Sequence, residues 1–232
     1  MGTALIALGG NVGDPAVTMQ QALSWLDHHP RLQVVAVSRV FSTVPVGTYA
    51  GGGFVNAAAR LATDLPPLDV LDLLQEAEQR AGRERTLHWG PRTLDLDLIG
   101  YDDLVLSHPR LQIPHPACWY RRFVLDPLAE VASDWQHPVL QLSVAELLDR
   151  LRPRPLPIAL DLPGILQQEL QSALSTAFPG QLKICEPGEQ SALSLTTKAS
   201  ACVRAIPVDP ASSAAALVEL VRAALDEPRP LP

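Results

Sequence analysis

Apolar and polar positions follow two different periods along the first two thirds of the chain. Alternating runs rich in β-branched residues predict strands, whereas apolar residues three and four positions apart predict amphipathic helices. The strands predicted in this way lie at 3–8, 32–42, 54–62, 93–98 and 104–106. Helices are predicted at 15–28 and 68–81, with a helix or turn over 120–131. Asp14 and Pro15 are typical of a helix start, because Asp caps the first N–H groups and Pro suits the first helical residue.

The stretch W-G-P-R-T-L-D-L-D-L, residues 89–98, holds the most distinctive chemistry. Asp95 and Asp97 fall on one face of the predicted strand and its leucines on the other. Two such carboxylates lie roughly 6.6 Å apart along the strand, so they can hold one hard cation such as Mg²⁺ or bridge a pair. A Gly-Pro turn brings Arg92 and Trp89 to the same end, where phosphates and a flat ring could bind. A strand with a merely solvated polar face is the less favoured alternative.

Other polar features allow two interpretations each. The glycine-rich segment 9–15 matches neither a phosphate-binding P-loop nor a dinucleotide fingerprint, so a tight turn is favoured over nucleotide binding. Asn56 lies in an apolar strand, where it either makes a core hydrogen bond or reads the amide-like edge of a ligand. The arginine-rich segment 80–85 is either solvated surface or a phosphate contact. Arg110 and His115 lie in a proline-rich loop that is a candidate for contacting a nucleotide.

Composition narrows the functional classes. A formal charge of −7 over 232 residues argues against a general nucleic-acid binder, because such proteins need a basic excess. No apolar run is long enough to span a bilayer, and the first residues lack signal-peptide features, so we expect a cytoplasmic protein. Three cysteines without C-x-x-C spacing suggest neither a disulfide framework nor a zinc site.

Composition changes after residue 152, where R-P-R-P-L-P is typical of an extended linker. We therefore expect a first domain over 1–152, a linker over 153–163 and a small α+β module over 164–232. Strands are predicted at 158–162, 182–185, 192–196 and 202–208, and helices at 165–178 and 212–225. This part shows no acid–base pair, metal cluster or phosphate loop. We expect a structural or partner-binding role, including self-association, with a regulatory small-molecule domain as the alternative.

Several motifs, taken together and in order, resemble the 6-hydroxymethyl-7,8-dihydropterin pyrophosphokinases of folate biosynthesis. They are A-L-G-G-N-V-G-D at 7–14, T-V-P-V-G at 43–47, F-V-N at 54–56, W-G-P-R-T-L-D-L-D at 89–97, I-P-H-P at 113–116 and R-R-F-V-L-D-P-L-A-E-V-A at 121–132. The resemblance covers residues 1 to about 152. It implies a ferredoxin-like α+β domain that transfers the pyrophosphoryl group of ATP to the pterin hydroxymethyl group and releases AMP.

The resemblance also implies roles for individual residues. Asp95 and Asp97 match the ligands of two Mg²⁺ ions, and Arg83 and Arg92 match arginines that hold the phosphates during transfer. Positions around ATP are matched by Gln75, Glu78, Arg85, Arg110, His115 and Arg121. The pterin pocket is matched by Thr43, Pro45, Val46, Phe54, Asn56, Trp89 and Phe123, with the Trp89 and Phe123 rings forming a stacking slot.

This sequence departs from the family pattern at a few positions. Phe54 stands where tyrosine is common, and Gln112 and Pro116 alter the nucleotide loop. Because no metal ligand or central arginine is lost, we expect an active enzyme. The alternative is a non-catalytic ATP or pterin binder that keeps the fold without turnover.

Overall fold

The computed structural model describes residues 1–43, 53–82, 92–186, 189–197 and 205–231. Its main sheet is antiparallel and runs in the order β14-β3-β4-β1-β5, with β2 also paired to β4. These strands are β1 (Gly2–Gly10), β2 (Leu32–Val37), β3 (Phe41–Thr43), β4 (Phe54–Thr63), β5 (Asp95–Tyr101) and β14 (Arg229–Pro230). No helix among the described residues is long and apolar enough to cross a membrane.

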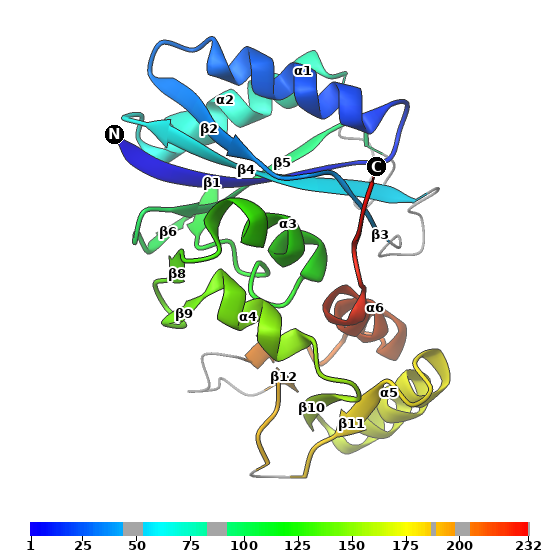
Figure 1. Cartoon of the computed structure of the whole chain (residues 1–232). Coiled ribbons are helices and arrows are strands. Elements are labelled where there is room, and N and C mark those ends of the chain that lie inside the picture. The colour runs from blue at the N-terminus through cyan, green and yellow to red at the C-terminus, as the bar shows by residue number, and fades with distance from the viewer. Residues whose placement is uncertain (44–52, 83–91, 187–188, 198–204, 232) are drawn as a thin grey trace.

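Helices cover both faces of this sheet (Figure 1). One face carries α1 (Pro15–Asp27) and α2 (Pro67–Arg80), and the other carries α3 (Arg122–Ala132) with α4 (Val144–Leu151) beneath it. Consecutive β1 residues Ala4, Leu5 and Ile6 are therefore all fully buried, because neighbouring side chains of a strand point to opposite faces. Two apolar cores result, one on each face of the sheet.

The first helix and the long strands lie close to where the sequence predicts them. Asp14 caps α1, accepting a hydrogen bond from the Val17 N–H at 3.2 Å, and Pro15 occupies the first turn. The expected strand 32–42 is divided into β2 and β3. The division falls at Arg39, whose N–H donates to Glu130 of α3 at 2.8 Å rather than to a neighbouring strand.

The segment expected as a proline-rich loop, 108–116, contains part of a hairpin instead. Strands β6 (Leu106–His108) and β7 (Leu111–Ile113) pair antiparallel, so the expected strand at 104–106 begins later. The Arg110 N–H donates to Nδ1 of His108 at 3.2 Å across the turn. A second short hairpin follows α3, formed by β8 (Gln136–His137) and β9 (Leu142–Ser143), and leads into α4.

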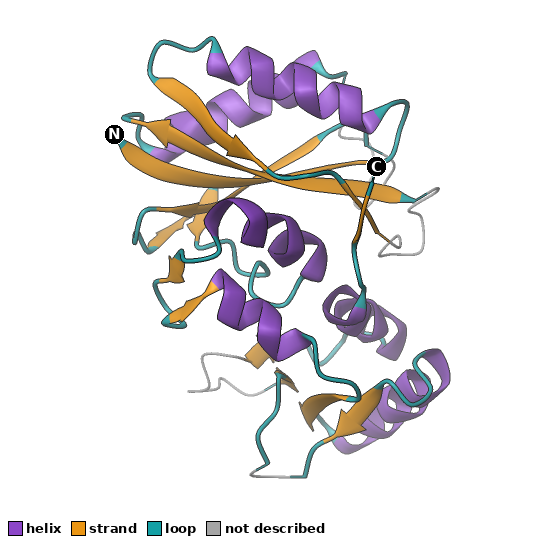
Figure 2. Cartoon of the chain, viewed as in Figure 1, coloured by secondary structure: helices purple, strands orange, loops and turns teal. Residues whose placement is uncertain are grey.

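The C-terminal part of the chain forms a separate sheet (Figure 2). Its elements are β10 (Leu156–Asp161), α5 (Gly164–Ala177), β11 (Leu182–Ile184), β12 (Leu193–Thr196), β13 (Ala205–Pro207) and α6 (Ala214–Leu225). The order is β11-β10-β12-β13 and every pair is parallel, which is an α/β arrangement rather than the expected α+β one.

The C-terminal sheet and the first part of the chain share one apolar core. That core runs from Leu5 of the main sheet through α3 and α4 to Leu156 and Ile158 of β10 and on to Val221 of α6. Strand β10 also lies within the range 153–163 that the sequence suggests as a linker. The two parts therefore pack together directly.

Candidate functional site

Register along the main sheet brings the candidate site residues together at one end. Gly9 of β1 pairs with Asn56 on one side and with Asp95 on the other, and Ala7 pairs with Asp97. Paired residues share a face, so these side chains form a row across three strands. A Cβ at Gly9 would lie 3.3 Å from Oδ1 of Asn56, which shows how closely the amide approaches the central strand.

The two aspartates have the alternation that the sequence predicts. Asp95 and Asp97 are half-buried, whereas the leucines beside them are buried. The Arg92 guanidinium forms an ion pair with the Asp95 carboxylate, and both side chains are 23% exposed. Asn11 holds the main chain here, since its Oδ1 accepts from the Arg92 N–H at 2.8 Å and its N–H donates to the Arg92 carbonyl at 2.9 Å. The arginine is thus fixed against the start of β5.

Glu78 of α2 binds the main chain of the aspartate strand. Its side chain on α2 is 3% exposed, and Oε1 accepts a hydrogen bond from the Leu96 N–H at 2.8 Å. This N–H points to the open edge of β5, the last strand in the sheet order, so its partner must come from outside the sheet. Glu78 therefore fixes the main chain between Asp95 and Asp97.

A cavity of about 570 Å³ opens beside Asp97. Its polar lining includes Arg110, Gln112 and His115, and its apolar lining includes Leu71 and Leu111. This volume lies within the usual range of small-molecule sites, and the mixture of apolar walls with a few convergent polar groups is typical of them.

The surroundings of Arg110 and His115 fix the position of the arginine and the protonation of the histidine. Arg110 forms an ion pair with Asp72 of α2, one helical turn from the half-buried Gln75. Burial lowers the pKa of His115, while the charge of Asp97 raises it and that of Arg121 lowers it. Nδ1 of His115 accepts from the Ala117 N–H at 3.2 Å, so the neutral ring carries its proton on Nε2.

Further candidates lie on β3, β4 and the first turn of α3. Thr43 is buried, and its Oγ1 accepts a hydrogen bond from Nδ2 of Asn56 at 2.8 Å. Thr43 pairs with Phe54 where β3 meets β4. Phe123 is half-buried on the first turn of α3, with the Arg121 guanidinium 5.6 Å from its ring centre. Asn56 thus has a core hydrogen bond to Thr43, while its Oδ1 lies close to Gly9, which separates it from Asp95 in the sheet.

The structure brings together most of the candidates that it describes, and it adds others. Five of the candidates lie outside the described residues: Pro45, Val46, Arg83, Arg85 and Trp89. Sequence reasoning missed Asn11 and Asp72, which hold Arg92 and Arg110. The spacing of Asp72, Gln75 and Glu78 at every third residue of one helix is the signal that could have found Asp72.

The donor set at the two aspartates suits a hard cation. Among the described residues no group of three or more His, Cys, Asp or Glu side chains could hold a metal by itself. Mg²⁺ usually takes one or two carboxylates and completes its shell with phosphate oxygens and water. Thr93 adds a buried Oγ1 without a hydrogen-bond partner, just before the two carboxylates. The residues present therefore fit Mg²⁺ that arrives with a phosphate ligand.

A carboxylate pair, an adjacent arginine and a nucleotide-sized cavity are the arrangement of a nucleotide-dependent phosphotransferase. The model of the 7,8-dihydro-6-hydroxymethylpterin-pyrophosphokinase (HPPK) family matches residues 5–133. The chain belongs to this family, whose members transfer pyrophosphate from ATP to hydroxymethyldihydropterin in folate synthesis.

Individual relatives agree with this assignment. The chain is 44% identical over 133 residues to 2-amino-4-hydroxy-6-hydroxymethyldihydropteridine pyrophosphokinase of Pseudomonas aeruginosa, covering 57% of this chain and 82% of that protein. It is 38% identical over 149 residues to the bifunctional protein FolKE of Lactococcus lactis, covering 63% of this chain but only 43% of that protein. The chain thus spans under half of the bifunctional relative.

A solved structure shows the same fold. A triple mutant of Plasmodium falciparum HPPK-DHPS aligns with a TM-score of 0.50 at 12% identity, covering 86% of this chain and 56% of that one. At this identity the likeness concerns the fold alone.

Proposed function

We propose that this chain transfers the pyrophosphoryl group of ATP to 6-hydroxymethyl-7,8-dihydropterin, using Mg²⁺ held at Asp95 and Asp97. The observation that carries the proposal is the register of the main sheet. It sets the two aspartates between the cavity beside Asp97 and the Thr43–Asn56 pair. One side of the row then takes the nucleotide and the other takes the pterin.

The nucleotide side of the proposal rests on charge. Arg110 and His115 would contact ATP, supported by the cavity that they line, and Arg121 is proposed with them from the family match. Gln75 lies on the α2 face that holds Arg110 in place through Asp72. We propose that Glu78 acts through the Leu96 N–H that it binds, rather than through ATP itself.

The pterin side of the proposal rests on amide recognition and stacking. Asn56 has a second N–H and an oxygen with which to bind the pterin edge, while Thr43 fixes its orientation. Phe123 would stack on the ring, together with Trp89. When bound, two Mg²⁺ ions supply charge neutralisation and alignment of the triphosphate.

In the proposed reaction the pterin hydroxyl oxygen forms a bond to the β-phosphorus of ATP. The bond from the β-phosphorus to the oxygen that bridges it to the α-phosphorus breaks, AMP leaves with that oxygen, and the hydroxyl proton passes to solvent. Arg92, fixed by Asn11, would stabilise the charge on the transferring phosphates, with Arg83 and Arg85 as further contacts proposed from the family match.

We also propose a ferredoxin-like description for the first part of the chain. Its support is the succession β1-α1-β2-β4-α2-β5 with the spatial order β5-β1-β4-β2. A domain over 1–152 followed by a module over 164–232 remains our proposed division, and the shared apolar core argues that the two parts fold against each other.

The test is AMP formation from ATP and Mg²⁺, with and without 6-hydroxymethyl-7,8-dihydropterin. We expect pterin-dependent AMP release, and a kcat at least about a hundredfold lower in Asp97→Asn, because several kcal/mol of charge stabilisation depend on this carboxylate. The matched control is Asp103→Asn, an exposed aspartate in the turn after β5, which should retain the wild-type rate.

Two results would count against the proposal. A wild-type protein that binds ATP and pterin but releases no AMP would be the non-catalytic binder. Equal activity in Asp97→Asn and Asp103→Asn would show that Asp97 is not a ligand of a catalytic metal ion.

A further inference from the structure

Residues 226–231, here called the return segment, lead from α6 back to the main sheet. In Figure 1 this segment is the red strand that rises from the C-terminal module to the edge of the sheet near β3. Arg229 and Pro230 pair antiparallel with Ser42 and Phe41 of β3. The Leu231 N–H then donates to the Val40 carbonyl at 2.8 Å.

The sequence of the return segment suits an edge strand. Successive N–H groups of a strand point to opposite sides. Because the Leu231 N–H points toward β3, the nitrogen of Pro230 faces away from β3, on the open edge of the sheet. Proline has no N–H to donate, and none is needed on that edge. Pro228 continues the same alternation in the sequence. The prolines also restrict the unbound segment, which lowers the entropy lost on pairing.

The strand that the return segment pairs with belongs to the proposed pterin side. β3 lies between β14 and β4, and its last residue, Thr43, holds the Asn56 amide. Phe41 pairs with Asn56 on one side and with Pro230 on the other. A displacement of the return segment would therefore reach Asn56 through a single strand.

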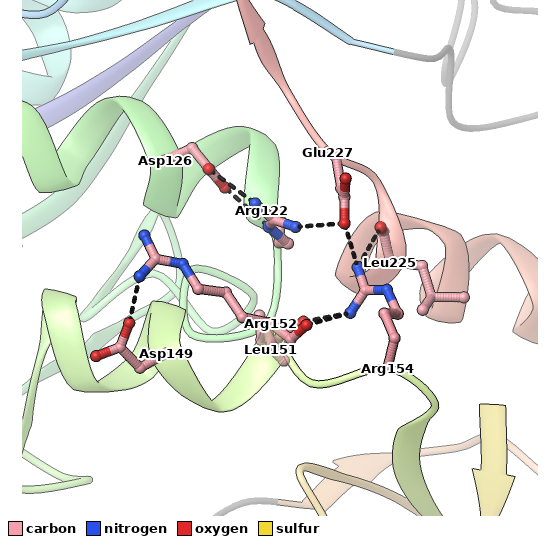
Figure 3. A network of polar contacts seen from close by, with 8 residues as sticks. All are labelled: Arg122, Asp126, Asp149, Leu151, Arg152, Arg154, Leu225 and Glu227. Atoms are coloured by element: carbon pink, nitrogen blue, oxygen red, sulfur yellow. Dashed lines mark hydrogen bonds and ion pairs between the residues drawn. The ribbon is translucent and has the colours of Figure 1, made fainter. Parts of the chain in front are cut away.

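Glu227 gives the return segment a second anchor (Figure 3). Its Oε1 accepts from Arg154 at 3.2 Å and lies 3.7 Å from Nη1 of Arg122. Arg154 also donates to the Leu225 carbonyl at 2.9 Å, tying the end of α6 to the start of the C-terminal sheet.

Arg122 is the inner end of this network. Its side chain is 8% exposed and binds Asp126 through two hydrogen bonds of 2.9 and 3.0 Å (Figure 3). Arg122 stands in the sequence between Arg121 and Phe123, which we propose as contacts of the nucleotide and of the pterin. Glu227 itself is 68% exposed, so its ion pair adds orientation more than stability.

We propose that the return segment positions the pterin-binding side of the site, through β3 and through the first turn of α3. This inference rests on the proposed function. The C-terminal module thereby acquires a role in substrate binding without contributing a residue that touches the substrate. Leu231 and Glu227 are positioning residues in this scheme.

The test compares Leu231→Pro with Leu231→Ala in the full chain. The proline variant removes the N–H that binds Val40, whereas the alanine variant keeps it. We expect Leu231→Pro to raise the Kd and KM for the pterin about threefold to tenfold, the range of one net hydrogen bond. The Kd for ATP should change less than twofold, and Leu231→Ala should match the wild type. Pterin binding is followed by tryptophan fluorescence with a non-hydrolysable ATP analogue and Mg²⁺.

A second pair of variants tests the other anchor. Glu227→Ala should raise the pterin Kd about twofold to threefold, and Glu227→Gln, which can still accept from Arg154, should restore most of it. If the wild type releases no pterin-dependent AMP, the proposed function fails. If the wild type is active and Leu231→Pro binds pterin as tightly as Leu231→Ala, the positioning role is wrong. A fall in kcat alone, or equal losses for ATP and pterin, would likewise overturn it.

Discussion

Replacing Gly10 with alanine tests how tightly the end of β1 packs against the start of the aspartate strand. A Cβ at Gly10 would lie 2.8 Å from the Thr93 carbonyl oxygen and 3.1 Å from Cβ of Pro15. Since carbon–oxygen contacts are rarely shorter than about 3.3 Å, the main chain at Thr93 must move by about 0.5 Å. The neighbour is backbone, so no side-chain rotation can relieve the contact.

Overpacking of this kind costs about 1–3 kcal/mol. For a chain of this size we expect Gly10→Ala to lower Tm by about 3–10 °C. Gly164→Ala is the matched control, because Gly164 is the first residue of α5 and a Cβ there meets nothing within 4 Å. That control should be neutral or stabilised by about 0.4–1 kcal/mol, since alanine reduces the freedom of the unfolded chain.

The same substitution should affect catalysis, because the displaced carbonyl is two residues before Asp95. Small misplacements of reacting groups are costly, and we expect kcat for AMP formation to fall about tenfold or more. Thermal unfolding by circular dichroism and the AMP assay give the two numbers. A Tm equal to that of Gly164→Ala, or an unchanged kcat despite a lowered Tm, would refute the proposed coupling between Gly10 and β5.

Two further predictions concern stability. Asp126→Asn should lower the free energy of unfolding in urea by about 3 kcal/mol, because it leaves the buried Arg122 guanidinium without its main counter-charge. The control is Glu76→Gln in the exposed pair with Arg80, which should cost under about 1 kcal/mol. Similar losses in both variants would contradict this prediction. Burial lowers the pKa of His137 from 6.5 to about 4, so the unfolded chain binds the proton more readily than the folded chain does. Burying the neutral ring therefore contributes fully to stability above about pH 6.5, and the contribution is lost as the pH falls toward 4. Between pH 7.5 and pH 5 the wild type should lose up to about 2 kcal/mol more of its free energy of unfolding than His137→Gln loses. If both proteins lose the same amount, His137 is not the source of the pH dependence.

Local patterns were enough to predict much of the fold. The alternation that places Asp95 and Asp97 on one face follows directly from the period of a strand, and so does the burial of the intervening leucines. The helices and strands after residue 152 also lie within a few residues of the predicted positions. Helix caps and apolar periods act over short distances, so a single sequence contains them.

Pairing between distant segments could not be read in this way. Whether β10 pairs parallel with β12 depends on how the chain crosses the sheet, which the strand period does not encode. The sequence predicted a turn at Gly9 and Gly10, but both residues lie inside β1. They are close to Asn56 and Thr93, which are distant in the sequence, so local patterns do not show why glycine is needed there. The partner of Glu78 was missed for the same reason.

The antiparallel pairing of β14 with β3 also constrains the order of events during synthesis. β3 leaves the ribosome early, together with the strands that it needs on its other side, but its outer neighbour is made only after the whole C-terminal module. A nascent chain can therefore form the central strands and both aspartates of β5 while the outer edge of β3 still faces water. The hydrogen bonds between β14 and β3 can form only once the residues of the C-terminal module have been made, so the completed outer edge of β3 reports that synthesis has passed this module.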